Sequence, residues 1–151
     1  MSQSLSWVLI HYVFSTKNRV AFLSDPSIRS EMLAYIAGIC ANIGSPSIIV
    51  VDTADHAHIL SALNRNHSIA DVIGTIKKNS SRWAKTKGGI FLKFQWQSGY
   101  GAFSVSKSHQ DRVREYIARQ ESHHRKITFQ DELRRLLRLH EVPFDERYLW
   151  D

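Results

Sequence analysis

Two largely apolar runs lie almost end to end in the middle of this chain, the β-branched SIIVVDTA at 47–54 and HAHILSAL at 56–63. Only a short polar turn separates them, so they are predicted to form a β-hairpin. A helical pattern precedes the hairpin over 26–42, and a second one follows it over 67–88. A hairpin flanked by two helices favours an antiparallel sheet with helices packed on it.

The remaining segments extend this pattern in both directions. WVLIHYVF at 7–14 is rich in β-forming residues, and 94–106 is aromatic, punctuated by glycine and predicted to be extended. Helical patterns over 108–126 and 128–142 complete the order β-α-β-β-α-β-α-α. This is a split β-α-β layout, so we expect an α+β, ferredoxin-like fold with additional C-terminal helices. Without a repeat or a long linker, residues 1–151 are interpreted as one domain.

Capping residues stand where these helices are predicted to begin. The candidates are Ser24 or Asp25, Ser68, Ser108, and Thr128, which forms a capping-box pattern with Asp131. Gly44 suits the end of the first helix. In the last helix, the predicted buried stripe consists of Leu133, Leu136, Leu137 and His140.

The charge balance of the chain indicates an anionic partner. Twenty Lys and Arg residues face fourteen Asp and Glu, a net charge of +6. Nucleic acid is the first candidate and a membrane surface the second, although a basic solvated surface without a specific partner is the alternative. The candidate DNA-binding residues are Lys77, Lys78, Arg82, Lys85, Arg112 and Arg119.

The single cysteine and the N-terminal segment indicate in which cellular compartment the protein is expected. Cys40, in an apolar helical stretch, excludes a disulfide within one chain and is predicted to be a small core residue. The apolar run near the N-terminus is broken by His11 and is too short to span a bilayer, and no basic segment precedes it. We therefore expect neither a signal peptide nor a membrane span, and a cytoplasmic protein.

The predicted strand over 56–63 carries two histidines, His56 and His58, on one face, while Ala57 points the other way towards the core. Imidazole is a common ligand of divalent metals, and two histidines leave coordination positions open for a substrate oxygen. The plainer interpretation is a pair of partly exposed histidines hydrogen-bonded to their neighbours.

A second pair of chemically useful residues follows on the predicted helix 108–126. Tyr116 and Gln120 are four residues apart and therefore share a face. A tyrosine hydroxyl can act as a covalent nucleophile, and an amide oxygen can bind a hard cation. The alternative is a tyrosine packed at the sheet edge beside a solvated glutamine.

Several segments together resemble one family. ADHAHIL, WQSGYGAFSVS and VREYIARQESHHRK are similar to the His-hydrophobic-His (HUH) single-tyrosine transposases of the insertion sequence 200/605 type. VFSTKNR, SIADVIGTIKKNSSRW and FDERYLW also resemble this family. The resemblance extends from about Ser4 to Trp150, with the small Ala57 where a bulkier apolar residue is usual.

The resemblance implies a metal-dependent endonuclease and religase that acts on single-stranded DNA through a 5′-phosphotyrosine intermediate. It implies that Tyr116 is the nucleophile and that His56, His58 and Gln120 bind Mg²⁺ or Mn²⁺. It further implies a homodimer that recognises subterminal DNA hairpins. Whether Tyr116 serves its own subunit or the partner's, and whether the element is still mobile, stays open.

Other residues near these motifs have weaker roles. Trp96, Tyr100 and Phe103 could stack on bases, although aromatic residues in an alternating strand are more often core. Tyr100 is also the second candidate nucleophile. His123 and His124 are expected to act at a helix end or on a phosphate, not on the metal.

Three alternative functions remain at this stage. The first is a relative linked to repetitive palindromic elements that binds a DNA hairpin without transposing. The second is a small metal-dependent phosphodiesterase, which would need more ligands than the motif offers. The third is a ferredoxin-like dimerising module, which leaves the histidine pair and the basic charge unexplained.

Overall fold

Four antiparallel strands form a sheet with the spatial order β2-β3-β1-β4 in the computed structural model, which describes residues 1–123 and 126–150. The strands are β1 (Leu9–Ser15), β2 (Ser47–Asp52), β3 (His56–Ala62) and β4 (Gly101–Val105). β1 and β3 are the central pair, and β2 and β4 are the edges. The predicted hairpin between the second and third strands is confirmed.

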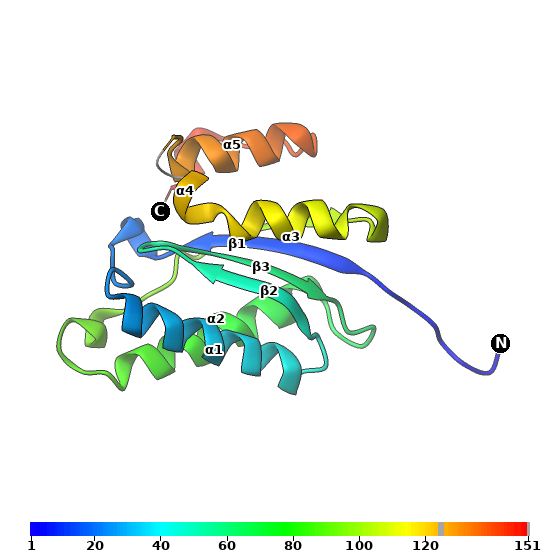
Figure 1. Cartoon of the computed structure of the whole chain (residues 1–151), viewed down its shortest axis with the longest axis horizontal. Coiled ribbons are helices and arrows are strands. Elements are labelled where there is room, and N and C mark those ends of the chain that lie inside the picture. Colours follow the sequence, from blue (N-terminus) through cyan, green and yellow to red (C-terminus); the bar gives the residue numbers. More distant parts are fainter. Residues whose placement is uncertain (124–125, 151) are drawn as a thin grey trace.

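Helices cover both faces of the sheet (Figure 1). On one side lie α1 (Pro26–Asn42) and α2 (Ile69–Lys85), and on the other lie α3 (Gln110–Ala118), α4 (Gln120–His123) and α5 (Phe129–Leu139). The split β-α-β arrangement with additional C-terminal helices is therefore confirmed. Among the described residues, no helix is both long and apolar enough to cross a membrane.

Alternation along the central strands explains why the sheet is buried on both sides. Tyr12, Phe14 and Ile59 face α1 and α2 and form the larger core, together with Met32, Ile36, Cys40, Val72 and Ile76. On the opposite face, Val13 and Phe103 pack against α5, while Leu9 and Leu60 pack near Ile117 of α3. The core position predicted for Cys40 is confirmed.

Local sequence signals set most of the helix starts. The Asp25 side chain accepts a hydrogen bond from Ser27 N, and α1 has the predicted bounds. Ser68 and Asp71 form a complete capping box on α2. Thr128 accepts from Asp131 N at the start of α5. Each such cap satisfies a backbone N–H that the helix leaves without an internal partner.

The predicted helix 108–126 is wrong at both ends. Ser108 does not cap it, because the Ser108 hydroxyl hydrogen-bonds the Ser106 hydroxyl and the His109 ring. A 3₁₀ turn comes first, and α3 begins at Gln110. The helix is interrupted at Arg119, whose backbone (φ −96°, ψ 15°) leaves the helical range, and the short helix α4 follows over Gln120–His123.

Two other predicted elements are shorter than expected. Within 94–106 only β4 is a strand, apart from an isolated bridge between Thr16 and Trp96. The backbone carbonyls of Gln97 and Gly99 accept hydrogen bonds from Lys77 Nζ instead of joining a ladder. The last helix ends at Leu139, so His140 is an exposed C-cap and not part of the buried stripe.

Candidate active site

The two histidines of β3 face the layer formed by α3 and α5. His58 lies opposite Val13 of β1, and His56 lies opposite Ser15. Ala57 points to the other face and is fully buried in the larger core, as predicted. Both histidines are also buried, so the interpretation of two partly exposed side chains is wrong.

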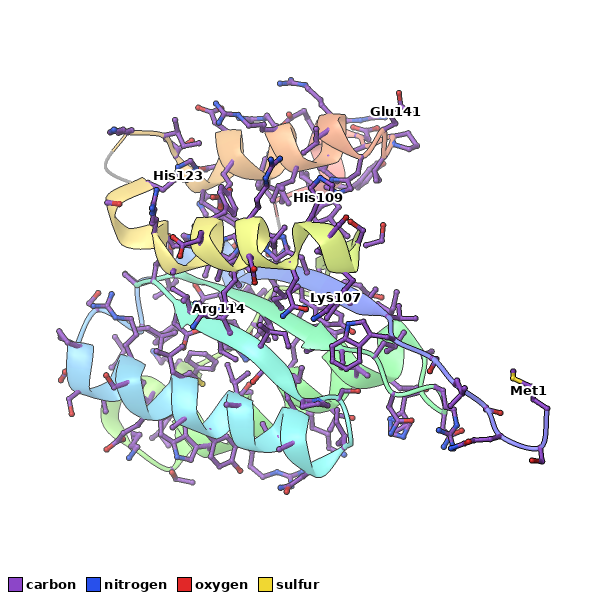
Figure 2. All side chains as sticks on the ribbon, turned by 45° about the vertical axis from the view of Figure 1, so that its right-hand side comes forward. Met1, Lys107, His109, Arg114, His123 and Glu141 are labelled. Atoms are coloured by element: carbon purple, nitrogen blue, oxygen red, sulfur yellow. The ribbon has the colours of Figure 1, made fainter. Side chains whose placement is uncertain are left out.

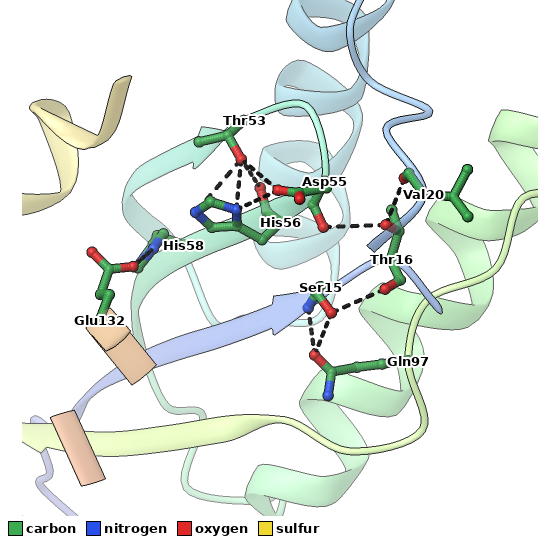
Figure 3. Close-up of polar contacts among 9 residues, drawn as sticks. All are labelled: Ser15, Thr16, Val20, Thr53, Asp55, His56, His58, Gln97 and Glu132. Carbon is green, nitrogen blue, oxygen red and sulfur yellow. Dashed lines mark hydrogen bonds and ion pairs between the residues drawn. The ribbon is translucent and has the colours of Figure 1, made fainter. Parts of the chain in front are cut away.

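Each of these imidazoles has its Nδ1 atom engaged by a neighbouring side chain. His56 Nδ1 lies 2.7 Å from Asp55 Oδ1 and 2.7 Å from Thr53 Oγ1, both in the turn before β3 (Figure 3). His58 Nδ1 lies 2.9 Å from His11 Nε2. With the proton on Nδ1, the lone pair of each ring is on Nε2, which is the arrangement that a metal-binding histidine needs.

Burial makes His11 a suitable partner for His58. The pKa of His11 is lowered well below its ordinary value, first by burial and then by the nearby His58. A neutral His11 can accept a hydrogen bond at Nε2, whereas a protonated one could only donate. Burial also acts to raise the pKa of Asp55, but hydrogen bonds from His56 and Thr53 keep it below its ordinary value.

Glu132 of α5 lies at the centre of the site with no exposed surface. Its Oε1 atom is 3.0 Å from His58 Nε2 (Figure 3). Its Oε2 atom accepts a hydrogen bond from the Tyr116 hydroxyl and lies 3.3 Å from His123 Nε2. One carboxylate thus contacts residues from β3, α3 and α4.

Tyr116 and Gln120 meet in this site despite the helix break between them. Burial raises the pKa of Tyr116, and the adjacent Glu132 raises it further, while a hydrogen bond from Gln120 acts in the opposite direction. Gln120 has no exposed surface, which contradicts the interpretation of a solvated glutamine. Within this single chain, the hydroxyl of Tyr116 therefore lies at the same carboxylate as His58.

The donor set suits a divalent cation. In the part of the chain that the structure describes, His56, His58 and Glu132 each offer one ligand atom, and these atoms lie within 4.8 Å of one another. Two imidazole nitrogens and a carboxylate oxygen are ligands that Mn²⁺ and related ions accept. The residues present therefore fit the cation that the resemblance implies.

Two of these residues were not predicted from the sequence. Glu132 is an acidic residue inside the apolar stripe of α5, between Phe129 and Leu136, and a charge in a buried stripe is a signal for a site. His11 interrupts an apolar strand in the same way. Both signals are visible in the sequence, but neither identifies the partner across the sheet.

Two hollows meet at Tyr116 and Arg112. The first, of about 560 Å³, is lined by Asp111, Arg112, Glu115, Tyr116, Arg119 and His123. The second, of about 520 Å³, lies between β4, α3 and α5 and has an apolar wall that includes Phe103, Val113, Leu136 and Leu139, with Arg112 and Arg135 also lining it. The surface beside Tyr116 thus combines arginines with an apolar wall.

The other predicted DNA-binding residues lie apart from this surface, on α2, which is on the opposite side of the sheet (Figure 1). Lys77 and Lys85 donate to backbone carbonyls of the chain itself. Lys78 and Arg82 are exposed. Arg112 and Arg119 are exposed near Tyr116, so the structure divides the six candidates between two faces.

The aromatic residues predicted to stack on bases, and the histidines predicted to act at a helix end, also lie in different environments. Trp96 and Phe103 are buried, and Tyr100 is the exposed member of the three. In Figure 2, Lys107 and His109 lie at the start of α3 and His123 at the opposite end. His123 faces Glu132 in the site, which the sequence did not predict, and His124 lies outside the described residues.

Comparison with known proteins gives a consistent family. The family model described as IS200-like transposase matches residues 4–120. The crystal structure of a protein assigned as a transposase from Deinococcus radiodurans R1 aligns with this chain with a TM-score of 0.62 and 21% sequence identity. The alignment covers 78% of this chain and 93% of that one. A REP-associated tyrosine transposase bound to a REP hairpin is 18% identical, with a TM-score of 0.60, over 91% of this chain and 88% of that one. No curated protein matches the chain.

Proposed function

Because this chain belongs to the family of IS200-like transposases, we propose that it cuts and rejoins single-stranded DNA with Tyr116 as the nucleophile. The observation that carries the proposal is the gathering of the Tyr116 hydroxyl and His58 around the buried carboxylate of Glu132. These groups come from three separate elements, and a structural role alone does not require a half-buried tyrosine next to a buried glutamate and two buried histidines, beside an arginine-lined hollow.

In the proposed reaction, the Tyr116 oxygen forms a bond to the phosphorus of a backbone phosphate, and the bond from phosphorus to the 3′-oxygen breaks. The products are a 5′-phosphotyrosine link and a free 3′-hydroxyl, and overall the phenol proton passes to the 3′-oxygen. Attack by another 3′-hydroxyl on the phosphotyrosine reverses the step and rejoins the strands. No external energy source is consumed, since one phosphodiester is exchanged for another.

His56, His58 and Gln120 are the proposed ligands for Mg²⁺ or Mn²⁺. Such a cation neutralises a non-bridging phosphate oxygen and stabilises the leaving group when it is bound. Asp55 and His11 orient the two imidazoles through Nδ1. Burial of the site excludes water, which strengthens these electrostatic interactions.

The proposed partners are a DNA strand with subterminal hairpins and a second copy of the chain. The edge strands β2 and β4 are the positions at which two sheets could join. A non-transposing hairpin-binding role is the second candidate, because a solved structure with this fold is bound to a REP hairpin. The two candidates differ in whether a covalent link to DNA forms.

A cleavage assay tests the proposal. The full chain is incubated with labelled single-stranded DNA from the flanks of its own gene, with Mn²⁺, Mg²⁺ or EDTA, and resolved on denaturing gels. We expect a metal-dependent covalent protein–DNA band that is absent with Tyr116→Phe and with duplex DNA. Loss of a catalytic nucleophile removes this product entirely.

Tyr100→Phe is the matched control, since Tyr100 is an exposed residue directly before β4, and it should retain the band. A band that persists with Tyr116→Phe and disappears with Tyr100→Phe would overturn the assignment. Tight hairpin binding without any covalent band would favour the second candidate.

A further inference from the structure

We propose that Glu132, supplied by α5, is a protein ligand of the divalent cation and that the same carboxylate holds Tyr116 in place. This inference rests on the proposed function, because it names a further residue of the same site. The family match ends at residue 120, twelve positions before Glu132, so the match itself assigns no role to this residue. The proposal therefore comes from the position of α5 over the sheet.

The spacing of the donor atoms supports direct ligation. Glu132 Oε1 and His58 Nε2 are 3.0 Å apart, which is a hydrogen-bond distance when Nε2 carries the proton and a ligand separation when a cation replaces that proton. Two adjacent ligands in an octahedral site with bonds of ~2.1 Å lie ~3.0 Å from each other. A ligand atom of His56 belongs to the same cluster, whose atoms lie within 4.8 Å of one another, so a cation could contact all three residues after small shifts of their side chains.

The two oxygens of Glu132 face different partners. Oε1 is directed to His58, whereas Oε2 accepts the hydrogen bond from Tyr116 and lies near His123. One oxygen can therefore bind the cation while the other keeps the nucleophile next to it.

The environment favours a role beyond packing. A carboxylate with no exposed surface needs hydrogen bonds or positive charge to offset its desolvation. The described cations nearest in sequence on α5 are engaged elsewhere or exposed: Arg134 pairs with Asp131 and Glu146, and Arg135 lines the hollow beside β4. Glu132 already has contacts with His58, Tyr116 and His123, and a bound divalent cation would add a full positive charge to them.

A metal titration tests the proposal independently of DNA cleavage. The full chain, freed of metal with EDTA, is titrated with Mn²⁺, and free Mn²⁺ is measured by electron paramagnetic resonance. Glu132→Gln keeps the shape but removes the charge, so we expect its Kd for Mn²⁺ to rise about tenfold or more. Asp131→Asn removes a charge from the adjacent, exposed position and should leave the Kd unchanged.

Circular dichroism of each variant checks that the fold is retained. If Glu132→Gln does not fold, Mn²⁺ soaked into crystals of the unaltered protein provides the second measurement. We expect an anomalous peak within about 2.5 Å of Glu132 Oε1 and of both histidines. A folded Glu132→Gln variant with unchanged Mn²⁺ affinity, or a peak remote from Glu132, would overturn the inference. Failure of the proposed function would instead leave Mn²⁺ bound at Glu132 without any tyrosyl-DNA product.

Discussion

Asp52, at the end of β2, differs from the buried polar residues of the site. Glu132, His11 and His58 all contact one another or a neighbour, but the Asp52 carboxyl is buried and makes no hydrogen bond to any described residue. It lies opposite Ala57 and therefore on the face covered by α1. Burial raises the pKa of Asp52 to about 8, although the charge of Arg29 acts to lower it.

This raised pKa predicts a pH-dependent stability. Between pH ~4 and ~8 the folded chain keeps a proton on Asp52 that the unfolded chain has released, so stability falls as the pH rises through this window. The expected slope from this group is about 1.4 kcal/mol of unfolding free energy per pH unit. Asp52→Asn should remove that slope, as measured by urea unfolding from pH 5 to 8.

Asp111→Asn, at an exposed position, is the control and should preserve the wild-type slope. Parallel pH profiles for wild type and Asp52→Asn would show that Asp52 is already ionised in the folded chain.

At the scale of elements, α5 both covers part of one face of the sheet and carries a residue of the site. Its stripe of Phe129, Leu133, Leu136 and Leu137 packs against Val13 and Phe103 from the two strands β1 and β4. Glu132 lies in the same stripe and is thereby directed at His58. The packing of α5 therefore determines whether the carboxylate reaches the histidines.

Two leucines on α5 provide a matched test of this packing. Leu133 is 5% exposed and Leu139 is 73% exposed. Leu133→Ala should lower the unfolding free energy by about 2–4 kcal/mol, because it leaves a cavity under the helix. Leu139→Ala should change it by no more than about 0.5 kcal/mol. Urea unfolding measures both, and equal effects would contradict the packing of α5 against β1 and β4.

At the scale of the whole molecule, the chain has a net charge of +6, and its candidate DNA-binding residues lie on two faces. Arg112 and Arg119 line the hollow at Tyr116, whereas Lys78 and Arg82 are exposed on α2 across the sheet. If the scissile strand crosses Tyr116, the first pair contacts its phosphates and the second pair does not.

The salt dependence of binding separates the two faces. Each phosphate contact to a single strand contributes about 0.7 to the slope of log affinity against log salt. Arg112→Ala should reduce the slope for a short single-stranded oligonucleotide by about 0.7, and Lys78→Ala should leave it unchanged. Fluorescence anisotropy from 50 to about 300 mM salt measures the slope, and the reverse result would place the strand on α2.

The sequence by itself determined what depends on neighbouring residues. Alternation on 56–63 predicted that His56 and His58 share a face opposite to Ala57, and the caps Asp25 and Ser68 predicted the starts of two helices. The element order predicted the split β-α-β sheet, because short connections leave few ways to pair the strands. The family resemblance is borne out by the match over residues 4–120.

Only the tertiary structure decided which elements face each other. Glu132 is 74 residues from His58 in the chain, and no local pattern encodes that contact. His11 reaches His58 because β1 and β3 are paired, and Gln120 is buried beside Tyr116 although the helix breaks at Arg119. Periodicity predicts which side of a helix or strand is buried. Which other element covers that side depends on packing across the whole sheet.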